Sequence, residues 1–151
     1  MKPELRKAVR ADAKEIVRLE DEIFSDAWSL FDIEAAIDDG GGVCYVAEAE
    51  GEIISYVIGR KIEPEAEIYR VATAKAYRRC GYSKLLIDFL FCAEGGVEKI
   101  FLEVRESNGA ARGLYSSLGF KEISVRKNYY KSPCENAVIM LKDKKNEDTC
   151  I

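Results

Sequence analysis

The chain has 151 residues, of which 48% are apolar and 33% are charged, so we expect one globular domain with its own core and exclude a disordered chain. Its net charge of −4 gives no general attraction to nucleic acid or to an anionic membrane, and we expect neither as a partner. The sequence contains no histidine, which excludes Ser-His and Cys-His nucleophile pairs and argues against a catalytic metal such as zinc.

The cysteines and the apolar segments indicate a cytoplasmic protein. Cys44, Cys80, Cys92, Cys134 and Cys150 are odd in number and widely spaced, without a C-x-x-C pair. We therefore expect reduced thiols rather than a disulfide framework. No basic-then-apolar leader opens the sequence, and no apolar run approaches the length of a membrane span.

The predicted elements follow the order β-α-α-β-β-β-α-β-α-β-β. Asp12 and Ser29 can cap two helices, and Gly40-Gly41-Gly42 breaks the chain after the second. Glu50-Gly51 is typical of a hairpin turn, and Gly119 fits a left-handed helix stop. Strands are predicted over residues 5–10, 43–49, 52–62, 67–73, 99–104, 121–125 and 137–141, and helices after Asp12, from Ser29 to about residue 38, over 81–93 and over 108–118.

This order predicts the α/β (α+β) class, with a mixed sheet and helices on both of its faces. Ligands in such sheets bind at the carboxyl ends of strands, where the chain turns into a helix. We expect a single domain over residues 1–142, followed by a polar tail over 143–151.

The most informative segment precedes the third predicted helix and reads Tyr77-Arg78-Arg79-Cys80-Gly81-Tyr82-Ser83-Lys84. A glycine lets backbone approach a ligand, a helix start offers free N–H groups, and arginines add positive charge for a phosphate. The N–H groups of Arg79 through Ser83 are therefore predicted to form a pyrophosphate cradle, in which the backbone of Cys80 matters more than its thiol. The segment alone leaves a plain solvated turn as the alternative.

Glu103 lies near the end of the apolar segment Leu102-Glu103-Val104-Arg105. A buried carboxylate is unfavourable unless it is paired, so a glutamate here can be a general base with a raised pKa. The alternative is an edge-facing glutamate that pairs with Arg105 or Lys99.

Three further candidates lie downstream. Tyr115 falls on the apolar stripe of its helix, as either a core tyrosine or a general acid. Asn108 can cap this helix, with or without a ligand contact. Asn128-Tyr129-Tyr130 lies between two predicted strands, where exposed aromatic residues form either a substrate wall or an ordinary packed turn.

Taken together, these segments resemble the GNAT N-acetyltransferase superfamily. The family pattern Arg/Gln-x-x-Gly-x-Gly/Ala corresponds to Arg78-Arg79-Cys80-Gly81-Tyr82-Ser83, where Ser83 replaces the last small residue and could add a hydroxyl donor. The sequence is most similar to the bacterial ribosomal-protein-alanine N-acetyltransferases. This likeness is carried by Ala27-Trp28-Ser29 (with alanine where that group usually has proline), Leu102–Arg105, Asn108 with Leu114–Phe120, and Arg126–Tyr130.

The resemblance implies a splayed sheet of about seven strands with about four helices, and acetyl-CoA as cosubstrate without a metal. It implies that Glu103 acts as base through water, that Tyr115 protonates the departing thiolate, and that no acyl-enzyme forms. The implied acetyl-CoA contacts are Val71, Ala72, Thr73, Arg78, Arg79, Cys80, Gly81, Tyr82, Ser83, Lys84, Asn108 and Tyr115. The implied acceptor-side residues are Trp28, Tyr69, Glu103, Tyr129 and Tyr130.

The implied acceptor is a primary amine. The leading candidate is the α-amine of the N-terminal alanine of small-subunit ribosomal protein eighteen. At pH 7, deprotonating an α-amine with a pKa of ~8 costs about 1.4 kcal/mol of free energy. Deprotonating a lysine amine with a pKa of ~10.4 costs about 4.6 kcal/mol. A carboxylate base therefore suits the α-amine better. The alternatives are a polyamine or aminoglycoside acetyltransferase, with Asp26 and Asp38-Asp39 in an acidic pocket, and a non-catalytic acetyl-CoA-binding module. We expect a monomer or a weak homodimer.

Overall fold

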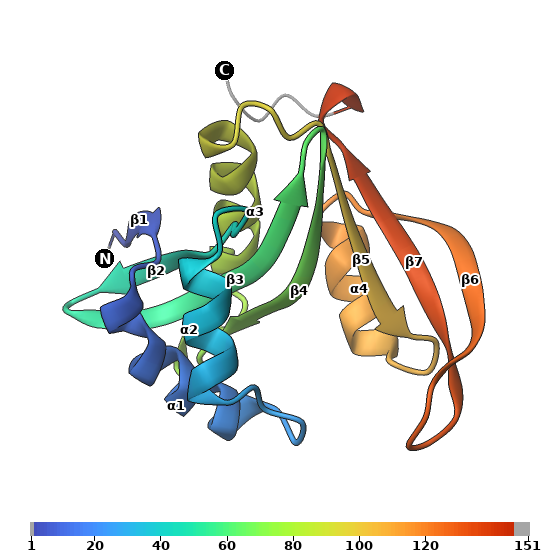
Figure 1. The fold of residues 1–151 in the computed structure, drawn as a ribbon, viewed down its shortest axis with the longest axis horizontal. Helices are drawn as coiled ribbons and strands as arrows, with labels where there is room; N and C mark the ends of the chain where they lie inside the picture. Colours follow the sequence, from blue (N-terminus) through green and yellow to red (C-terminus); the bar gives the residue numbers. More distant parts are fainter. Residues whose placement is uncertain (1, 147–151) are drawn as a thin grey trace.

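A computed structural model describes residues 2–146 (Figure 1). Its strands form one seven-stranded sheet in the order β1-β2-β3-β4-β5-β7-β6. Strands β4 and β5 pair in parallel, and the other neighbouring strands are antiparallel. The elements are β1 (Glu4–Lys7), α1 (Ala13–Ile23), α2 (Leu30–Asp38), β2 (Tyr45–Ala49), β3 (Glu52–Ile62), β4 (Glu65–Thr73), α3 (Tyr82–Ala93), β5 (Lys99–Arg105), α4 (Gly109–Ser117), β6 (Lys121–Tyr130) and β7 (Glu135–Asp143), with 3-10 turns η1 (Arg10–Asp12), η2 (Lys75–Tyr77) and η3 (Lys144–Asn146).

The predicted order of helices and strands is confirmed, and the boundaries differ mainly in the last two strands. Strand β6 runs on to Tyr130, and β7 runs to Asp143. The end of β6 pairs with the start of β7 at Tyr130 and Glu135, so Tyr129 and Tyr130 lie in a strand and not in a loop. The end of β7 pairs with β5, where Asp143 lies opposite Lys99. The predicted polar tail therefore begins inside β7, and residues 147–151 lie outside the described residues.

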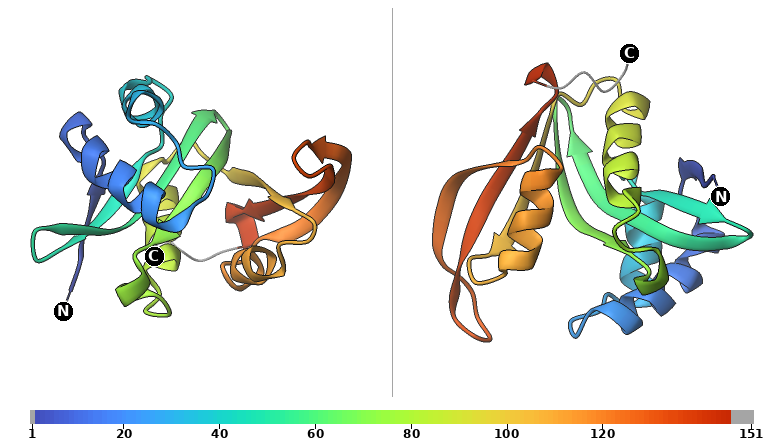
Figure 2. Two further views of the ribbon diagram at one scale, coloured as in Figure 1. Left: turned by 90° about the horizontal axis from the view of Figure 1, so that it is seen from below. Right: turned by 180° about the vertical axis from the view of Figure 1, so that it is seen from behind.

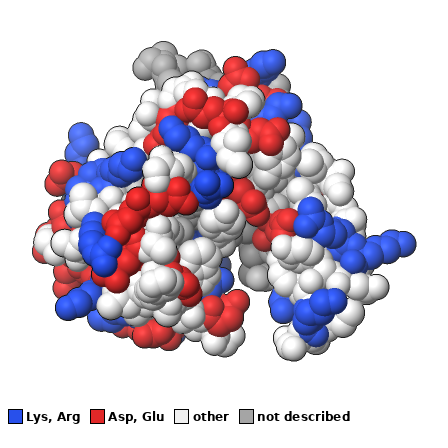
Figure 3. Space-filling model, in the orientation of Figure 1, with Lys and Arg blue, Asp and Glu red and all other residues white. Residues whose placement is uncertain are grey.

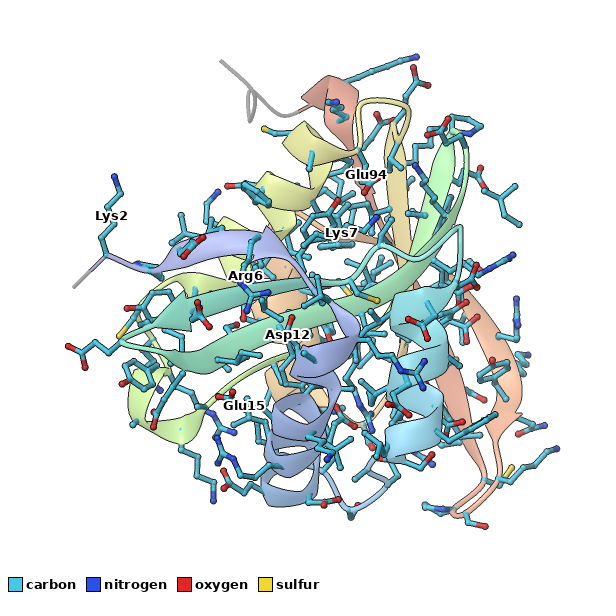
Figure 4. All side chains as sticks on the ribbon, turned by 60° about the vertical axis from the view of Figure 1, so that its left-hand side comes forward. Lys2, Arg6, Lys7, Asp12, Glu15 and Glu94 are labelled. Carbon is cyan, nitrogen blue, oxygen red and sulfur yellow. The ribbon has the colours of Figure 1, made fainter. Side chains whose placement is uncertain are left out.

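Two of the predicted helix signals work as expected, and a third works differently. The Ser29 hydroxyl accepts the Asp32 N–H at 3.1 Å, and Gly119 stops α4 in the left-handed region with φ of 96°. Asp12 precedes α1, but its carboxylate accepts the Val9 N–H at 2.8 Å and pairs with Arg6 at 2.8 Å instead of capping the helix. Figure 4 shows the Arg6 and Asp12 side chains directed toward each other. This interaction ends β1 early and turns the chain into η1.

Helices cover both faces of the sheet (Figure 2). Helices α3 and α4 pack on one face, and α1 and α2 pack on the other, over β2 to β4. Among the described helices, none covers β5 to β7 on the α1–α2 face. The core on the α3–α4 side includes Leu86, Leu90, Phe91, Leu102 and Val104, and the core on the α1–α2 side includes Ile16, Leu19, Ile33, Tyr56 and Ile58.

Strands β4 and β5 separate after a short paired stretch, which confirms the predicted splay. Their parallel pairing ends at Ile68 and Leu102, whereas β4 stays paired with β3 up to Thr73 and β5 stays paired with β7 up to Arg105. Both strands therefore continue while diverging from each other, as Figure 1 shows. We call the opening between them the wedge.

A β-bulge lies in β4 where the wedge begins. Ile58 pairs with Arg70 and Gly59 pairs with Ile68, so Tyr69 is the extra residue on β4. A bulge bends its strand and increases the local twist, which turns β4 away from β5. Gly59 permits this close approach, because a Cβ atom at that position would lie 2.4 Å from the Glu67 carbonyl oxygen.

The described cysteines only partly follow the expectation of reduced thiols. Cys44, Cys80 and Cys134 are free, and burial raises the pKa of the Cys44 thiol to about 11. Cys92 is disulfide-bonded, so the expectation is wrong for this residue. Spacing along a sequence does not reveal whether a given cysteine forms a disulfide, and Cys150 lies outside the described residues. Within residues 2–146, no helix is long and apolar enough to cross a membrane.

Candidate functional site

The predicted cradle lies between the end of β4 and the start of α3. Arg79 and Gly81 both have left-handed backbone, with φ of 64° and 82°. In the described part of the chain, the N–H groups from Arg79 to Lys84 make no hydrogen bond, and the first bonded N–H of the helix is that of Leu85, which reaches the Gly81 oxygen at 3.1 Å. These free donors at the positive end of a helix dipole suit an anion.

Two cationic side chains of this segment, those of Arg78 and Lys84, contact other groups of the protein. Arg78 is exposed and its Nε donates to the Thr73 oxygen at 3.3 Å, which directs it back toward β4. Lys84 is exposed and pairs with Asp88 at 2.9 Å along the helix. The Cys80 thiol donates to the Arg78 oxygen at 3.6 Å, so it belongs to the loop's own hydrogen bonding.

Three hydroxyl groups connect the cradle to the sheet. The Ser55 hydroxyl donates to the Ala72 oxygen at 2.9 Å, because a carbonyl oxygen can only accept. Ser55 has then used its single proton, so Thr73 donates to Ser55 across 2.8 Å, and Ser83 in turn donates to Thr73 across 3.1 Å. In this chain of hydroxyls, Ser83 has no proton left for a ligand. Its predicted role as an extra donor is therefore not supported, because its proton is used within the protein.

Val71, Ala72 and Thr73 of β4 are predicted to pair with the ligand, and the backbone groups of two of them face the wedge. The Ala74 N–H donates to the Ile54 oxygen at 2.8 Å, and the Ala72 oxygen accepts from Ser55, so both groups point toward β3. Backbone groups alternate in direction along a strand. Those of Val71 and Thr73 therefore point into the wedge, while those of Ala72 point away from it.

Glu103 lies one residue beyond the last residue of β5 that pairs with β4. Its carboxylate is 3.4 Å from the Arg126 guanidinium, and it raises the pKa of the neighbouring Tyr129 hydroxyl. The predicted partners Arg105 and Lys99 are not its partners, since Arg105 pairs with Glu135 at 3.3 Å. The long β6 strand decides this pairing by bringing Arg126 and Tyr129 across β7.

Glu103 lines a pocket of about 450 Å³ on the α1–α2 face of the sheet, beside the part over β5 to β7 that no described helix covers. The surface is notched in this region, between the α1–α2 part and the β5–β7 part (Figure 3). The residues around the pocket come from β3 to β7, and they are Arg60, Ile62, Glu65, Ala66, Glu67, Tyr69, Phe101, Leu102, Glu103, Arg126 and Ile139.

Glu67 is a pocket carboxylate that sequence reasoning missed. It pairs in register with Phe101 of β5, which places it on the same face as Glu103. Burial and the charge of Glu103 raise the pKa of Glu67, although Arg126 opposes this. The alternation of side chains along β4 was the sequence signal that would have placed Glu67 beside Tyr69.

Tyr115 reaches the wedge from the opposite face. It is half-buried on α4 and packs against the α3–α4 core, with its ring edge-on to Phe120 at 5.9 Å. Burial raises the pKa of Tyr115, against the opposing charge of Arg70, so the phenol is protonated at neutral pH. Since the alternate β5 residues Leu102 and Val104 face α4, Glu103 and Tyr115 lie on opposite sides of the sheet.

The remaining predicted residues fall into two groups. Asn108 caps α4 by accepting the Ala111 N–H at 3.1 Å, which confirms its capping role. On the pocket side, Tyr129 and Tyr130 meet edge to face at 5.1 Å, and Arg126 lies 5.0 Å from the Tyr129 ring centre.

Trp28 comes from the α1–α2 loop and meets Tyr69 of β4. Their ring centres are 5.8 Å apart, and the Trp28 N–H donates to Glu20 at 3.0 Å. Glu20 and its partner Arg70 were missed by sequence reasoning, because nothing local to either residue indicates their pairing. In the described part of the chain, no group of His, Cys, Asp and Glu side chains could hold a metal ion.

The sequence matches a known protein family and individual relatives. The model of the acetyltransferase (GNAT) family matches residues 13–120. A ribosomal protein bS18-alanine N-acetyltransferase of Haemophilus influenzae is 44% identical over 94 residues, which are 59% of this chain, and the chain spans 64% of that relative's length. An N-alpha-acetyltransferase RimI of Mycobacterium tuberculosis is 34% identical over 143 residues, 89% of this chain and 88% of the relative.

The fold agrees as well. The crystal structure of the ribosomal-protein-S18-alanine N-acetyltransferase from Escherichia coli superposes with a TM-score of 0.83 at 27% identity, covering 93% of each chain. The family model covers well over half of the chain, and the splayed sheet carries an open cradle at the start of α3. The chain therefore belongs to the acetyltransferase (GNAT) family.

Proposed function

We propose that this protein transfers the acetyl group of acetyl-CoA directly to the N-terminal α-amine of a protein, namely the alanine of ribosomal protein bS18. The observation that carries the proposal is the placement of Glu103 and Tyr115 on opposite sides of one wedge. The acceptor is supported by the relatives in Haemophilus influenzae and Escherichia coli, which are named for that alanine.

The open cradle and the free edge of β4 fit acetyl-CoA. The N–H groups of Arg79 to Ser83 would hold the pyrophosphate, with Arg78 and Lys84 adding long-range charge. Val71 and Thr73 would hydrogen-bond the amides of the pantetheine arm as a neighbouring strand does. This arrangement would direct the thioester into the wedge, between Tyr115 on one side and the pocket on the other.

The proposed reaction needs two proton transfers. Glu103 accepts a proton from the acceptor ammonium through a water molecule, which makes the amine nucleophilic. The amine nitrogen then bonds to the acetyl carbon while the carbon–sulfur bond breaks. Tyr115 gives its proton to the departing thiolate, and its raised pKa keeps that proton available at neutral pH.

The charged residues favour an α-amine over a polyamine. The carboxylates that would form a separate acidic pocket are already paired, since Asp26 contacts Arg70 and Asp39 contacts Arg60. The carboxylates that do line the pocket with Glu103 are Glu65 and Glu67. These carboxylates can attract one ammonium group. A carboxylate base such as Glu103 suits an α-amine, whose deprotonation at pH 7 costs about 1.4 kcal/mol.

The test uses two peptides that begin with the N-terminal sequence of bS18 and contain an internal lysine, one with a free and one with a blocked N terminus. Mass spectrometry should find acetylation of the free α-amine and none of the blocked peptide. Acetylation confined to the lysine would refute the α-amine assignment.

The catalytic roles need separate variants. Glu103→Gln and Tyr115→Phe should each lower kcat by about 100-fold while leaving the Kd for CoA within about threefold. Tyr45→Phe is the matched control, because it removes a phenol that donates to Glu94 of the α3 end and that does not line the pocket. If neither Glu103→Gln nor Tyr115→Phe lowers turnover, the catalytic assignment is wrong.

A further inference from the structure

The α1–α2 loop, residues 24–29, is fixed by one arginine of β4. The bulge leaves Tyr69 without a partner on β3 and directs both Tyr69 and Arg70 toward this loop. The Arg70 guanidinium lies 3.8 Å from the Phe24 ring centre. It also donates to the Asp26 carbonyl oxygen at 2.9 Å and to the Asp26 carboxylate at 3.2 Å.

The partner of Arg70 inside the protein is Glu20 of α1. Both Glu20 oxygens lie 3.2 Å from Arg70 Nε, and the Glu20 side chain is 0% exposed. Glu20 also accepts the Trp28 N–H at 3.0 Å and the Tyr56 hydroxyl at 2.5 Å. Arg70 and Glu20 together therefore hold the loop at its beginning, middle and end.

The last of these contacts connects the loop to the pocket. The Trp28 ring packs on Tyr69, and Tyr69 lines the pocket beside Glu67 and Glu103. Moving the loop would therefore move one wall of the pocket while leaving in place the cradle, which lies at the start of α3 on the other face of the sheet.

Resting on the proposed function, we infer that Arg70 is a positioning residue that determines how tightly the acceptor peptide binds. By holding residues 24–29 against Glu20, it keeps Trp28 and Tyr69 together as the surface that meets the first acceptor residues. Arg70 touches neither reactant, and its effect is on acceptor binding and not on acetyl-CoA binding.

Removing Arg70 alone would leave the Glu20 charge buried without its partner, which strongly destabilises a protein. The test therefore uses the double variant Glu20→Gln/Arg70→Met, which removes both charges. Arg70→Lys is the conservative variant, because it keeps a charge beside Glu20 but lacks the planar fork that reaches Asp26 and stacks on Phe24. Arg18→Met is the control, since Arg18 pairs with Glu22 on the surface of the same helix at 2.9 Å.

Trp28 is the only tryptophan of the chain, so its fluorescence reports the loop without an activity assay. In the folded double variant we expect red-shifted emission and about a twofold rise in acrylamide quenching, as for a side chain released from packing. The KM for the acceptor peptide should rise about tenfold, while kcat and the KM for acetyl-CoA change less than about twofold. Arg70→Lys should fall between the double variant and wild type, and Arg18→Met should match wild type.

Unchanged Trp28 emission in the folded double variant would show that Arg70 and Glu20 do not hold the loop. A released Trp28 with an unchanged acceptor KM would show that the loop does not position the acceptor. A parallel loss of acetyl-CoA affinity would mark a general structural role and would equally overturn the inference. If the wild type acetylates a different amine, the proposed acceptor is wrong, and the same variants test Arg70 with that amine.

Discussion

The hydroxyl chain from Ser83 through Thr73 to Ser55 makes a sharp prediction for Ser83→Ala. In the structure the Ser83 proton goes to Thr73, so the hydroxyl donates nothing to a phosphate. The substitution should then remove one neutral hydrogen bond, worth about 1 kcal/mol of folding free energy. For a chain of this size, that lowers the melting temperature by about 2–4 °C.

Affinity for CoA separates this arrangement from direct phosphate binding. A hydroxyl that donated to the pyrophosphate would make a charge-assisted bond worth about 1.5–3 kcal/mol. Its loss would weaken CoA binding by about 10-fold to 150-fold. With the proton committed to Thr73, Ser83→Ala should change the Kd for CoA by less than about threefold, measured by isothermal titration calorimetry.

The partner substitution Thr73→Val tests whether Ser83 and Thr73 are joined by one hydrogen bond. It should destabilise the protein and leave the Ser83 proton without its acceptor. If Ser83 and Thr73 act through one bond, thermal denaturation of the two single variants and the double variant should give a coupling of about 1 kcal/mol. If Ser83→Ala weakens CoA binding tenfold or more without lowering the melting temperature, the Ser83 proton goes to the phosphate and not to Thr73.

The remaining predictions concern backbone geometry and pH. Gly81→Ala should weaken CoA binding and destabilise the fold by about 1–2 kcal/mol, because Gly81 has φ of 82°; calorimetry showing wild-type affinity would contradict this. Gly59→Ala should destabilise by about 3 kcal/mol, since the new Cβ would lie 2.4 Å from the Glu67 oxygen; a wild-type melting temperature would count against the bulge. Burial raises the pKa of Asp12, but the hydrogen bond from Arg6 outweighs it and lowers this pKa below its ordinary 3.8. The ionised Asp12 therefore stabilises the folded state above pH 3.8. This stabilisation is lost as the pH falls through the lowered pKa. Urea denaturation should therefore find Asp12→Asn less stable than wild type at neutral pH, with the difference closing in acid; a difference independent of pH would exclude this origin.

Signals that act over a few residues were sufficient for the order of elements and for the free N–H groups at the start of α3. Ser29 caps its helix by a bond to the N–H three residues on, and Gly119 stops α4 because glycine tolerates a positive φ. The free N–H groups after Arg79 follow from the start of a helix at a glycine. Such features depend on periodicity and local backbone preference, which the sequence displays directly.

The surroundings of the candidate site residues depend on contacts between residues far apart in the chain, which local sequence patterns do not reveal. Glu103 pairs with Arg126 rather than with its near neighbours, because β6 extends beyond its apolar pattern. Arg70 meets Glu20 across fifty positions of sequence, because a bulge opposite Gly59 redirects it. Strand register, bulges and buried ion pairs are set by packing of the whole sheet, and no periodicity within one segment encodes them.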